Sequence, residues 1–157
     1  MKIKLCRIDD RLIHGQVATV WAHEANAERI IICSDEVAGD EIRRTLLKQV
    51  APPGIKVSVV SVDKAVRVYN NPKYAEDSVF FLYTCPQDVL RMVEAGVPIK
   101  SLNIGGMSFK QGKEQITKAV SVNESDKEAF RALDKHGVEL EIRPIATDPK
   151  VNLMEKI

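Results

Sequence analysis

Short apolar runs alternate along this chain with segments in which apolar residues recur at the helical period. The runs are about five residues long and predict strands at 2–8, 29–33, 56–60, 78–84, 100–104 and 138–142. Strands that alternate with helices are typical of a parallel sheet, because parallel neighbours must be joined by a crossover, which a helix can supply. The pattern therefore predicts an α/β fold built on a parallel sheet.

Helices are predicted between these strands. One begins near Gly15, and the others span 39–50, 61–70, 86–96 and 125–137. The apolar stripe of the first helix is expected to pack on the sheet, and it consists of Val17, Val20 and Trp21. The second helix places three apolar residues in register, namely Ile42, Leu46 and Val50.

Residues typical of helix ends support these boundaries. Ser61 is expected to cap the third helix, and Ser125 with Glu128 is expected to form a capping box for the last one. Gly137 is placed to end that helix. The segment 105–112 is expected to form a glycine-containing loop, in which the paired glycines make a sharp turn.

Length and charge limit the possible functions. A chain of 157 residues fits one domain, 1–157, with a single core. Lys and Arg total 23 against 22 Asp and Glu, so no broad electrostatic attraction to nucleic acid or anionic lipid is expected. Any anion site must therefore be local.

The cysteines and the first residues point to a reducing compartment. Cys6, Cys33 and Cys85 form no close pair, which favours free thiols. The segment up to Arg7 contains no long apolar stretch, so neither a signal peptide nor a spanning helix is expected there. A cytoplasmic location is the expectation.

In open α/β sheets, ligands bind beyond the carboxyl ends of the strands. Five corners of the predicted sheet qualify, at 9–15, 34–39, 61–63, 84–87 and 105–112. The first concentrates two carboxylates, a guanidinium, an imidazole and a glycine in seven residues. It is the first candidate for a functional site.

His14 is the candidate nucleophile of this corner. It lies beside the predicted N-terminus of the first helix, where unpaired amides and the helix dipole favour a phosphoryl group. A neutral imidazole can accept and release such a group near pH 7. Arg11 offers a bidentate fork to its oxygens, and Gly15 allows close approach of the backbone. Asp9 or Asp10 is expected either to fix the tautomer of His14 or to cap the helix.

The first corner could also bind a metal, and the other two histidines have different expected roles. Asp9, Asp10 and His14 supply oxygen and nitrogen ligands for a metal, although one short loop is weak evidence for such a site. His23 is expected to be solvated, and His136 is expected to have a structural role at a helix C-terminus.

The segment 7–17, RIDDRLIHGQV, resembles the active-site segment of the IIB components of the mannose, fructose and sorbose class of the bacterial phosphoenolpyruvate-dependent sugar phosphotransferase system (PTS). The likeness covers essentially the whole chain, including Trp21, 35–40 and 103–107. Sorbose-type IIB is the most similar type within the class, through 43–47, 51–53 and 148–152. Ser34 departs from the pattern, because relatives often carry a second acidic residue beside Asp35.

This resemblance implies a fold, a reaction and a set of partners. The fold is an open, twisted, mostly parallel sheet of seven strands with helices on both faces and one antiparallel strand near the end. His14 accepts a phosphoryl group from phosphorylated IIA and transfers it to a sugar that moves through the membrane components IIC and IID. The protein is thus expected to act as a protein-phosphohistidine–sugar phosphotransferase in peripheral contact with a membrane complex.

The phosphoryl contacts are expected from Arg11, Gly15, Gln16 and Asp10, and no metal, nucleotide or other cofactor is expected. Sorbose is the first candidate sugar, and mannose, fructose and N-acetylgalactosamine are the alternatives.

Two different functional classes also fit parts of the sequence. A phosphoaspartate receiver needs paired acids after its first strand, an acid after its third and a Thr or Ser after its fourth, which Asp9, Asp10, Asp63 and Thr84 supply loosely. The strand that ends at Ile104 is followed by glycines rather than by the lysine such receivers need. A nucleotide-dependent enzyme is disfavoured because GxGxxG is missing from the first turn and GxxxxGK[ST] from the whole chain.

Overall fold

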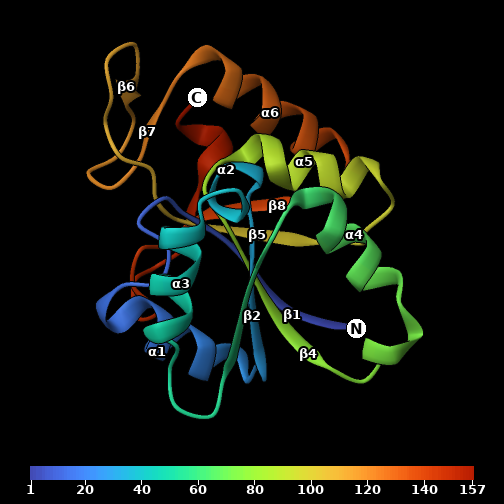
Figure 1. Cartoon of the computed structure of the whole chain (residues 1–157). Coiled ribbons are helices and arrows are strands. Elements are labelled where there is room, and N and C mark those ends of the chain that lie inside the picture. Colours follow the sequence, from blue (N-terminus) through green and yellow to red (C-terminus); the bar gives the residue numbers. More distant parts are fainter.

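The computed structural model describes the backbone of residues 1–157 and the side chains of all of them except 16–19. A seven-stranded sheet crosses the molecule, with strand order β3-β2-β4-β1-β5-β8-β9 (Figure 1). All neighbours in it pair in parallel except β8 and β9. The predicted α/β class, the mostly parallel sheet and the antiparallel strand near the end are confirmed.

The strands closely follow the predicted spans. They are β1 Lys2–Asp9, β2 Arg29–Cys33, β3 Lys56–Val60, β4 Ser78–Tyr83, β5 Ser101–Gly106, β8 Glu139–Ile142 and β9 Val151–Asn152. A separate two-stranded hairpin is made of β6 Glu114–Gln115 and β7 Ser121–Val122. Strand β1 lies between β4 and β5, with Ile8 opposite both Tyr83 and Ile104. The chain order reverses at β1, which makes its carboxyl end a topological switch point.

Helices cover both faces of the sheet, as the resemblance implies. They are α1 Gly15–Ala25, α2 Asp35–Ala38, α3 Glu41–Gln49, α4 Val62–Asn70, α5 Pro86–Glu94 and α6 Glu124–Lys135. Helices α1 and α3 lie on one side of the sheet, and α4, α5 and α6 lie on the other (Figure 1). Among the described residues, none of these helices is long and apolar enough to cross a bilayer.

Each face has its own apolar cluster. Trp21 and Ala22 of α1 pack with Ile30, Ile32 and other residues on the first face. The cluster on the second face is larger, because three helices contribute to it; Val62, Met92, Phe130 and Leu133 are among its members. Burial of both sheet faces explains why the central strands are almost continuously apolar.

The second predicted helix differs from the structure. The span 39–50 is interrupted before Asp40, whose side chain caps α3 by accepting from Arg43 N, and a separate short helix α2 precedes it. The predicted stripe of α3 faces solvent: the exposed fractions are 74% for Ile42, 55% for Leu46 and 55% for Val50. Leu47 is the residue of α3 that packs against the core.

The first helix also differs in part. Trp21 is buried as predicted, whereas Val20 is 39% exposed. The prediction that Val20 is buried was therefore wrong, and the side chain of Val17 lies outside the described residues.

Two further local predictions are corrected. The capping box of α6 joins Asn123 and Asp126, not Ser125 and Glu128, because the helix begins two residues earlier than a cap at Ser125 would place it. Gly105 and Gly106 belong to β5 rather than to a turn, since the strand continues past Ile104 to pair with β1. Ser61 caps α4 as predicted, and Gly137 follows the end of α6 with φ +82°.

Candidate functional site

The first corner follows β1 at the switch point of the sheet. Its turn closes with a hydrogen bond from Leu12 N to Asp9 O at 2.9 Å, and Asp10 N donates to Gly106 O at 3.1 Å. Leu12 is buried with φ +62°, a left-handed conformation that strains a branched residue with a Cβ. Gly15 follows with φ +43°. Helix α1 begins directly after this strained turn, and His14 is its N-cap residue.

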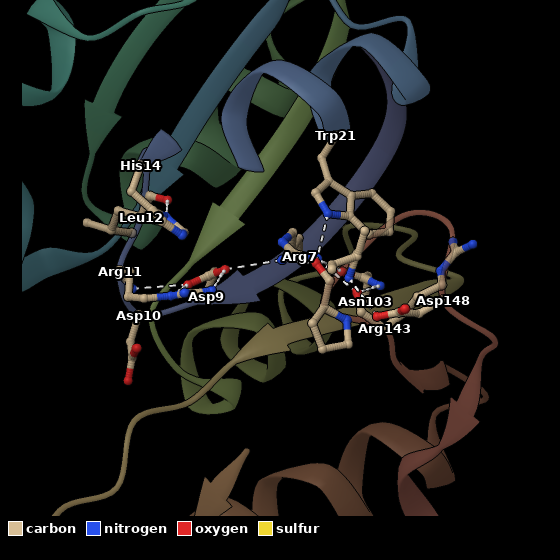
Figure 2. Close-up of polar contacts among 12 residues, drawn as sticks. Arg7, Asp9, Asp10, Arg11, Leu12, His14, Trp21, Asn103, Arg143 and Asp148 are labelled. Atoms are coloured by element: carbon tan, nitrogen blue, oxygen red, sulfur yellow. Dashed lines mark hydrogen bonds and ion pairs between the residues drawn. The ribbon is translucent and has the colours of Figure 1, made fainter. Parts of the chain in front are cut away.

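His14 is partly exposed and makes no side-chain cap hydrogen bond to α1. Its Nδ1 lies 3.0 Å from the carbonyl oxygen of Leu12 (Figure 2). A carbonyl can only accept, so in this rotamer Nδ1 carries the proton and Nε2 keeps the lone pair. In the neutral form of this rotamer, Nε2 is therefore the nucleophilic nitrogen.

Arg11 is paired side-on with Asp9. Its Nε donates to Asp9 Oδ1 at 3.0 Å and its Nη2 donates to Asp9 Oδ2 at 3.1 Å (Figure 2). Hydrogen bonding to Asp9 raises the pKa of Arg11 above its usual value. The Arg11 side chain is 53% exposed, whereas Asp9 is fully buried. One edge of the guanidinium is thus anchored while the rest of the group reaches solvent.

Asp9 has a second cationic partner on its inner side. Arg7 is wholly buried, and its Nη2 donates to Asp9 Oδ2 at 3.1 Å. The other hydrogens on its two Nη atoms meet the carbonyl oxygens of Arg143 and Pro144, each at 3.1 Å, and the side-chain oxygen of Asn103, whereas its buried Nε has no hydrogen-bond partner. Burial lowers the pKa of Arg7 to about 10, so it remains a cation at neutral pH.

Trp21, from α1, packs against the arginines of this buried network. The Arg7 guanidinium carbon lies 4.6 Å from the centroid of the indole, and that of Arg143 lies 5.0 Å from it. The indole Nε1 donates to Pro144 O at 3.2 Å (Figure 2). Cation–π contacts and hydrogen bonds of this kind partly offset the cost of burying a guanidinium.

Two glycines make room for the arginines. A Cβ on Gly105 would overlap the Arg7 guanidinium, and a Cβ on Gly106 would lie 3.2 Å from both Arg11 Nη2 and Asp9 Oδ1. The paired glycines of β5 thus leave space for the charged side chains that pack against them, and they do not form a turn.

The roles expected for the acidic pair are corrected by these contacts. The Nδ1 of His14 meets a backbone carbonyl, so neither Asp9 nor Asp10 fixes its tautomer. Asp10 accepts from Ser108 N at 2.7 Å and from Ser108 Oγ at 2.9 Å, which ties the first corner to the chain after β5. A phosphoryl contact from Asp10 stays a prediction, and the side chain of Gln16 lies outside the described residues.

The side chains of this corner line a cleft of about 600 Å³. Asp10, Arg11 and His14 form one wall, and the chain after β5 and the loop after β8 supply others. Phe109 and Ile145 also line it and are 67% and 59% exposed. The cleft therefore presents exposed apolar side chains near His14.

Asp35 and Asp63, which follow β2 and β3, belong to a different arrangement. Asp35 accepts from Val62 N at 2.9 Å and from Arg91 Nη1 at 2.9 Å, and Arg91 also pairs with Asp63 at 3.4 Å. Ser34 caps α2 through Val37 N. These contacts tie α2, α4 and α5 together.

Neither a metal site nor a receiver site is supported by this geometry. Among the residues that the structure describes, no three His, Cys, Asp or Glu side chains form a group able to hold a metal ion. Asp9, which a receiver would need open to its phosphoryl donor, is buried between two arginines. His23 and His136 are both exposed, as predicted for a solvated His23, and the structural role of His136 stays a prediction.

Sequence reasoning found His14 and Arg11 but assigned no role to the buried network. Arg7 and Asn103 stand in apolar strands, where the pattern alone suggests only alternation. A usable signal was present: Arg7 directly follows Cys6 and precedes Ile8, so it lies in a stretch that is buried on both faces. Charged residues in such strands are almost always paired.

Comparison with known proteins gives consistent results. The family model "PTS system sorbose subfamily IIB component" matches residues 3–157. The chain is 62% identical to the sorbose-specific EIIB component of Klebsiella pneumoniae, over 100% of this chain and 96% of that protein. It is 60% identical to the mannose-specific EIIAB component of Escherichia coli K12, over 100% of this chain but only 49% of that longer protein. The crystal structure of the IIBSor domain of the Klebsiella pneumoniae sorbose permease superposes with a TM-score of 0.98 at 62% identity, covering 99% of this chain and 96% of that one.

Proposed function

The chain belongs to the sorbose subfamily of PTS IIB components, and on this basis we propose that it carries a phosphoryl group on His14 from a phosphorylated IIA protein to a sugar. Membership confirms the resemblance of the segment 7–17 and the role in PTS sugar phosphotransfer. The acceptor residue, the partners and the order of transfer are the content of the proposal.

The observation that carries the proposal is the position of His14. Its partly exposed imidazole lines an open cleft at the N-terminus of α1, and Arg11 lines the same cleft. Helix N-termini favour anions, and a guanidinium stabilises the charged oxygens of a phosphoryl group. The corner thus combines a nucleophile with an anion site.

In the first step, a ring nitrogen of His14 attacks the phosphorus of a phosphohistidine on IIA. A new P–N bond forms as the P–N bond to the donor imidazole breaks, and its electron pair returns to the donor nitrogen. Because the incoming group is already activated, catalysis requires mainly alignment and charge neutralisation.

In the second step, a hydroxyl oxygen of the sugar attacks the same phosphorus. The P–O bond forms, the P–N bond to His14 breaks with its electron pair returning to the imidazole, and the hydroxyl proton passes to solvent. In the proposal this happens at the membrane components IIC and IID, which the protein contacts peripherally from the cytoplasm. The protein then acts as a protein-phosphohistidine–sugar phosphotransferase.

The local charge supports binding of the phosphoryl group. Asp9 carries one negative charge between the two cations Arg7 and Arg11, so this ion triplet sums to +1. Arg11 is its exposed member and faces the cleft that contains His14. A moderate positive field of this kind favours the adduct without holding it too tightly for onward transfer.

Sorbose is proposed as the sugar, with mannose, fructose and N-acetylgalactosamine as alternatives. Proteins similar to this chain are described as sorbose-specific, mannose-specific and fructose-specific, at 62%, 60% and 45% identity respectively. The proposed donor fits the mannose-specific relative, which is described as an EIIAB component.

The proposal is tested by replacing His14. We expect His14→Ala to fold normally, because the side chain is partly exposed and caps nothing, and to take up no phosphoryl group from phosphorylated IIA. Intact-mass measurement after incubation with the general PTS proteins and IIA gives the readout. The label on the wild-type protein should be labile in acid and stable in alkali, as expected for phosphohistidine.

His23→Ala and His136→Ala serve as matched controls, because both side chains are exposed. Each should be labelled like the wild-type protein. Label on His14→Ala, or a label destroyed by alkali and hydroxylamine, would contradict the proposal.

A further inference from the structure

We infer that Asp9, seated on Arg7, is a positioning residue that holds Arg11 in the orientation needed for phosphoryl transfer. The inference rests on the proposed function and adds a residue to it. Asp9 lies below the cleft and is fully buried, so it acts through Arg11 rather than on the phosphoryl group itself.

The side-on geometry of the pair leaves donors for a ligand. Arg11 uses the hydrogen on Nε and one hydrogen on Nη2 to bind the two oxygens of Asp9. A guanidinium has five N–H donors, so three remain, two of them on Nη1. These three donors are the ones available to phosphoryl oxygens in the cleft.

Anchoring removes a cost that an exposed arginine otherwise brings. A free arginine side chain loses about 2 kcal/mol of rotamer entropy when it is ordered. Arg11 is 53% exposed, yet its guanidinium is held at Nε and Nη2, and its backbone N also donates to Asp9 Oδ1 at 3.2 Å. The ordering is therefore completed before the phosphoryl group arrives.

Asp9 can serve as an anchor because Arg7 holds it in turn. Asp9 Oδ2 lies 3.1 Å from both Arg7 Nη2 and Arg11 Nη2. Arg7 itself is fixed by two backbone carbonyls, by Asn103 and by the face of Trp21. A continuous series of contacts therefore connects the core of the protein, through Arg7 and Asp9, to Arg11 in the cleft.

A double-mutant cycle tests whether Asp9 acts through Arg11. We expect Asp9→Asn to lower the kcat of transfer from phosphorylated IIA by about tenfold, with KM for that donor changed less than twofold. Arg11→Ala should lower the rate by about 10². If Asp9 only positions Arg11, adding Asp9→Asn to Arg11→Ala should cause no further loss. Losses that multiply in the double variant, or an unchanged kcat in Asp9→Asn, would overturn the inference.

A matched control separates positioning from general destabilisation. Asp77 accepts from Arg29 Nε at 2.9 Å, outside the cleft, ahead of β4. Asp77→Asn therefore removes the same charge beside the same kind of donor. It should leave kcat unchanged, and a loss equal to that of Asp9→Asn would assign the effect to stability alone.

Gly106→Ala provides a second perturbation if Asp9→Asn does not fold. Its new Cβ would lie 3.2 Å from Arg11 Nη2 and Asp9 Oδ1, so the exposed guanidinium must shift. We expect a loss of severalfold in kcat that disappears in the Arg11→Ala background. Transfer at the wild-type rate in the folded Gly106→Ala variant would count against positioning.

A spectroscopic readout distinguishes failure of this inference from failure of the proposed function. In ¹⁵N-edited NMR, the Arg11 Nε–H should exchange slowly with water in the wild-type protein and rapidly in Asp9→Asn, whether or not His14 is phosphorylated. Equal exchange in both proteins refutes the anchoring of Arg11. Absence of label on wild-type His14 refutes the phosphocarrier proposal instead.

Discussion

His14 and Arg11 occupy one strained turn, yet they are held by different means. The imidazole is fixed by the backbone carbonyl of Leu12, two residues away. The guanidinium depends on Asp9 and, through it, on Arg7 in the interior. Local contacts therefore suffice to orient the proposed nucleophile, whereas the orientation of Arg11 depends on the assembled sheet.

Arg11→Ala should leave the fold intact and slow phosphoryl transfer. The side chain is half exposed, so its loss removes little packing. The expected decrease in rate is about 10², the usual scale for losing one donor to a developing oxyanion. Rapid-quench measurement of label transferred from phosphorylated IIA provides the rate.

Urea unfolding of the same variant is the control, and the midpoint should shift only slightly. A transfer rate equal to that of the wild-type protein would show that Arg11 makes no contact with the phosphoryl group.

Residue identities pointed to His14 as the candidate nucleophile but did not predict the buried network beside it. His14, Arg11 and Gly15 stand together in sequence, so their combination was visible. The partners of Arg7 were not, because they stand 96, 136 and 137 residues further along the chain, at Asn103, Arg143 and Pro144. Only the pairing of β1 with β5 and β5 with β8 brings them together.

Helices and strands were predicted well in position and less well in orientation. Helix α3 shows why: its apolar stripe at Ile42, Leu46 and Val50 has the helical period, but the helix packs through Leu47. Periodicity identifies a face without showing what that face contacts. The first turn of α6 failed for a related reason, since Asn123 and Ser125 are both good caps and only the backbone path decides between them.

The cap of α6 gives a prediction at this scale. Asn123 Oδ1 accepts from Asp126 N at 2.7 Å, and Asp126 returns a bond to Asn123 N at 3.1 Å. Asn123→Ala should lower the free energy of unfolding by about 1 kcal/mol, measured by urea denaturation.

Ser125→Ala is the comparison, because Ser125 is exposed and lies inside the helix. Its effect should stay within about 0.5 kcal/mol. A larger effect for Ser125→Ala than for Asn123→Ala would restore the capping box expected from the sequence.

At the scale of the whole molecule, one charged cluster lies at the switch point and another lies at the corners that follow β2 and β3. The ion triplet of Arg7, Asp9 and Arg11 lies at β1, and Asp35 with Arg91 joins the corner after β2 to α5. The second cluster contacts no residue of the His14 cleft in the described contacts and links three separate helices. We therefore expect it to act on stability.

Stability in acid should depend on Asp35. Its hydrogen bond from Val62 N and its contact with Arg91 lower the pKa of its carboxyl. The folded state then binds fewer protons than the unfolded state below about pH 4, so this contribution is complete above the unfolded pKa of about 3.9 and is lost as pH falls through the folded value.

Because the Asp35 and Arg91 side chains are 55% and 43% exposed, Asp35→Asn should lower the free energy of unfolding by only roughly 0.5 kcal/mol at pH 7 and by less at pH 3, as measured by urea denaturation across that range. Glu76→Gln, which alters an 87% exposed partner of Lys2, should show no such dependence. A constant difference between Asp35→Asn and the wild-type protein at all pH values would show that the carboxyl does not titrate abnormally.

The net charge of the ion triplet has a consequence for the order in which partners bind. A phosphoryl group brings a charge of about −2, so on the proposed function the summed charge of the triplet and the phosphoryl group changes from +1 to about −1 when His14 is loaded. Within the Debye length of about 8 Å, a partner that is attracted to one form is repelled by the other. The phosphoryl group itself then determines which partner is attracted to the site. A phosphoryl donor can dissociate and an acceptor can bind without a conformational change in this protein.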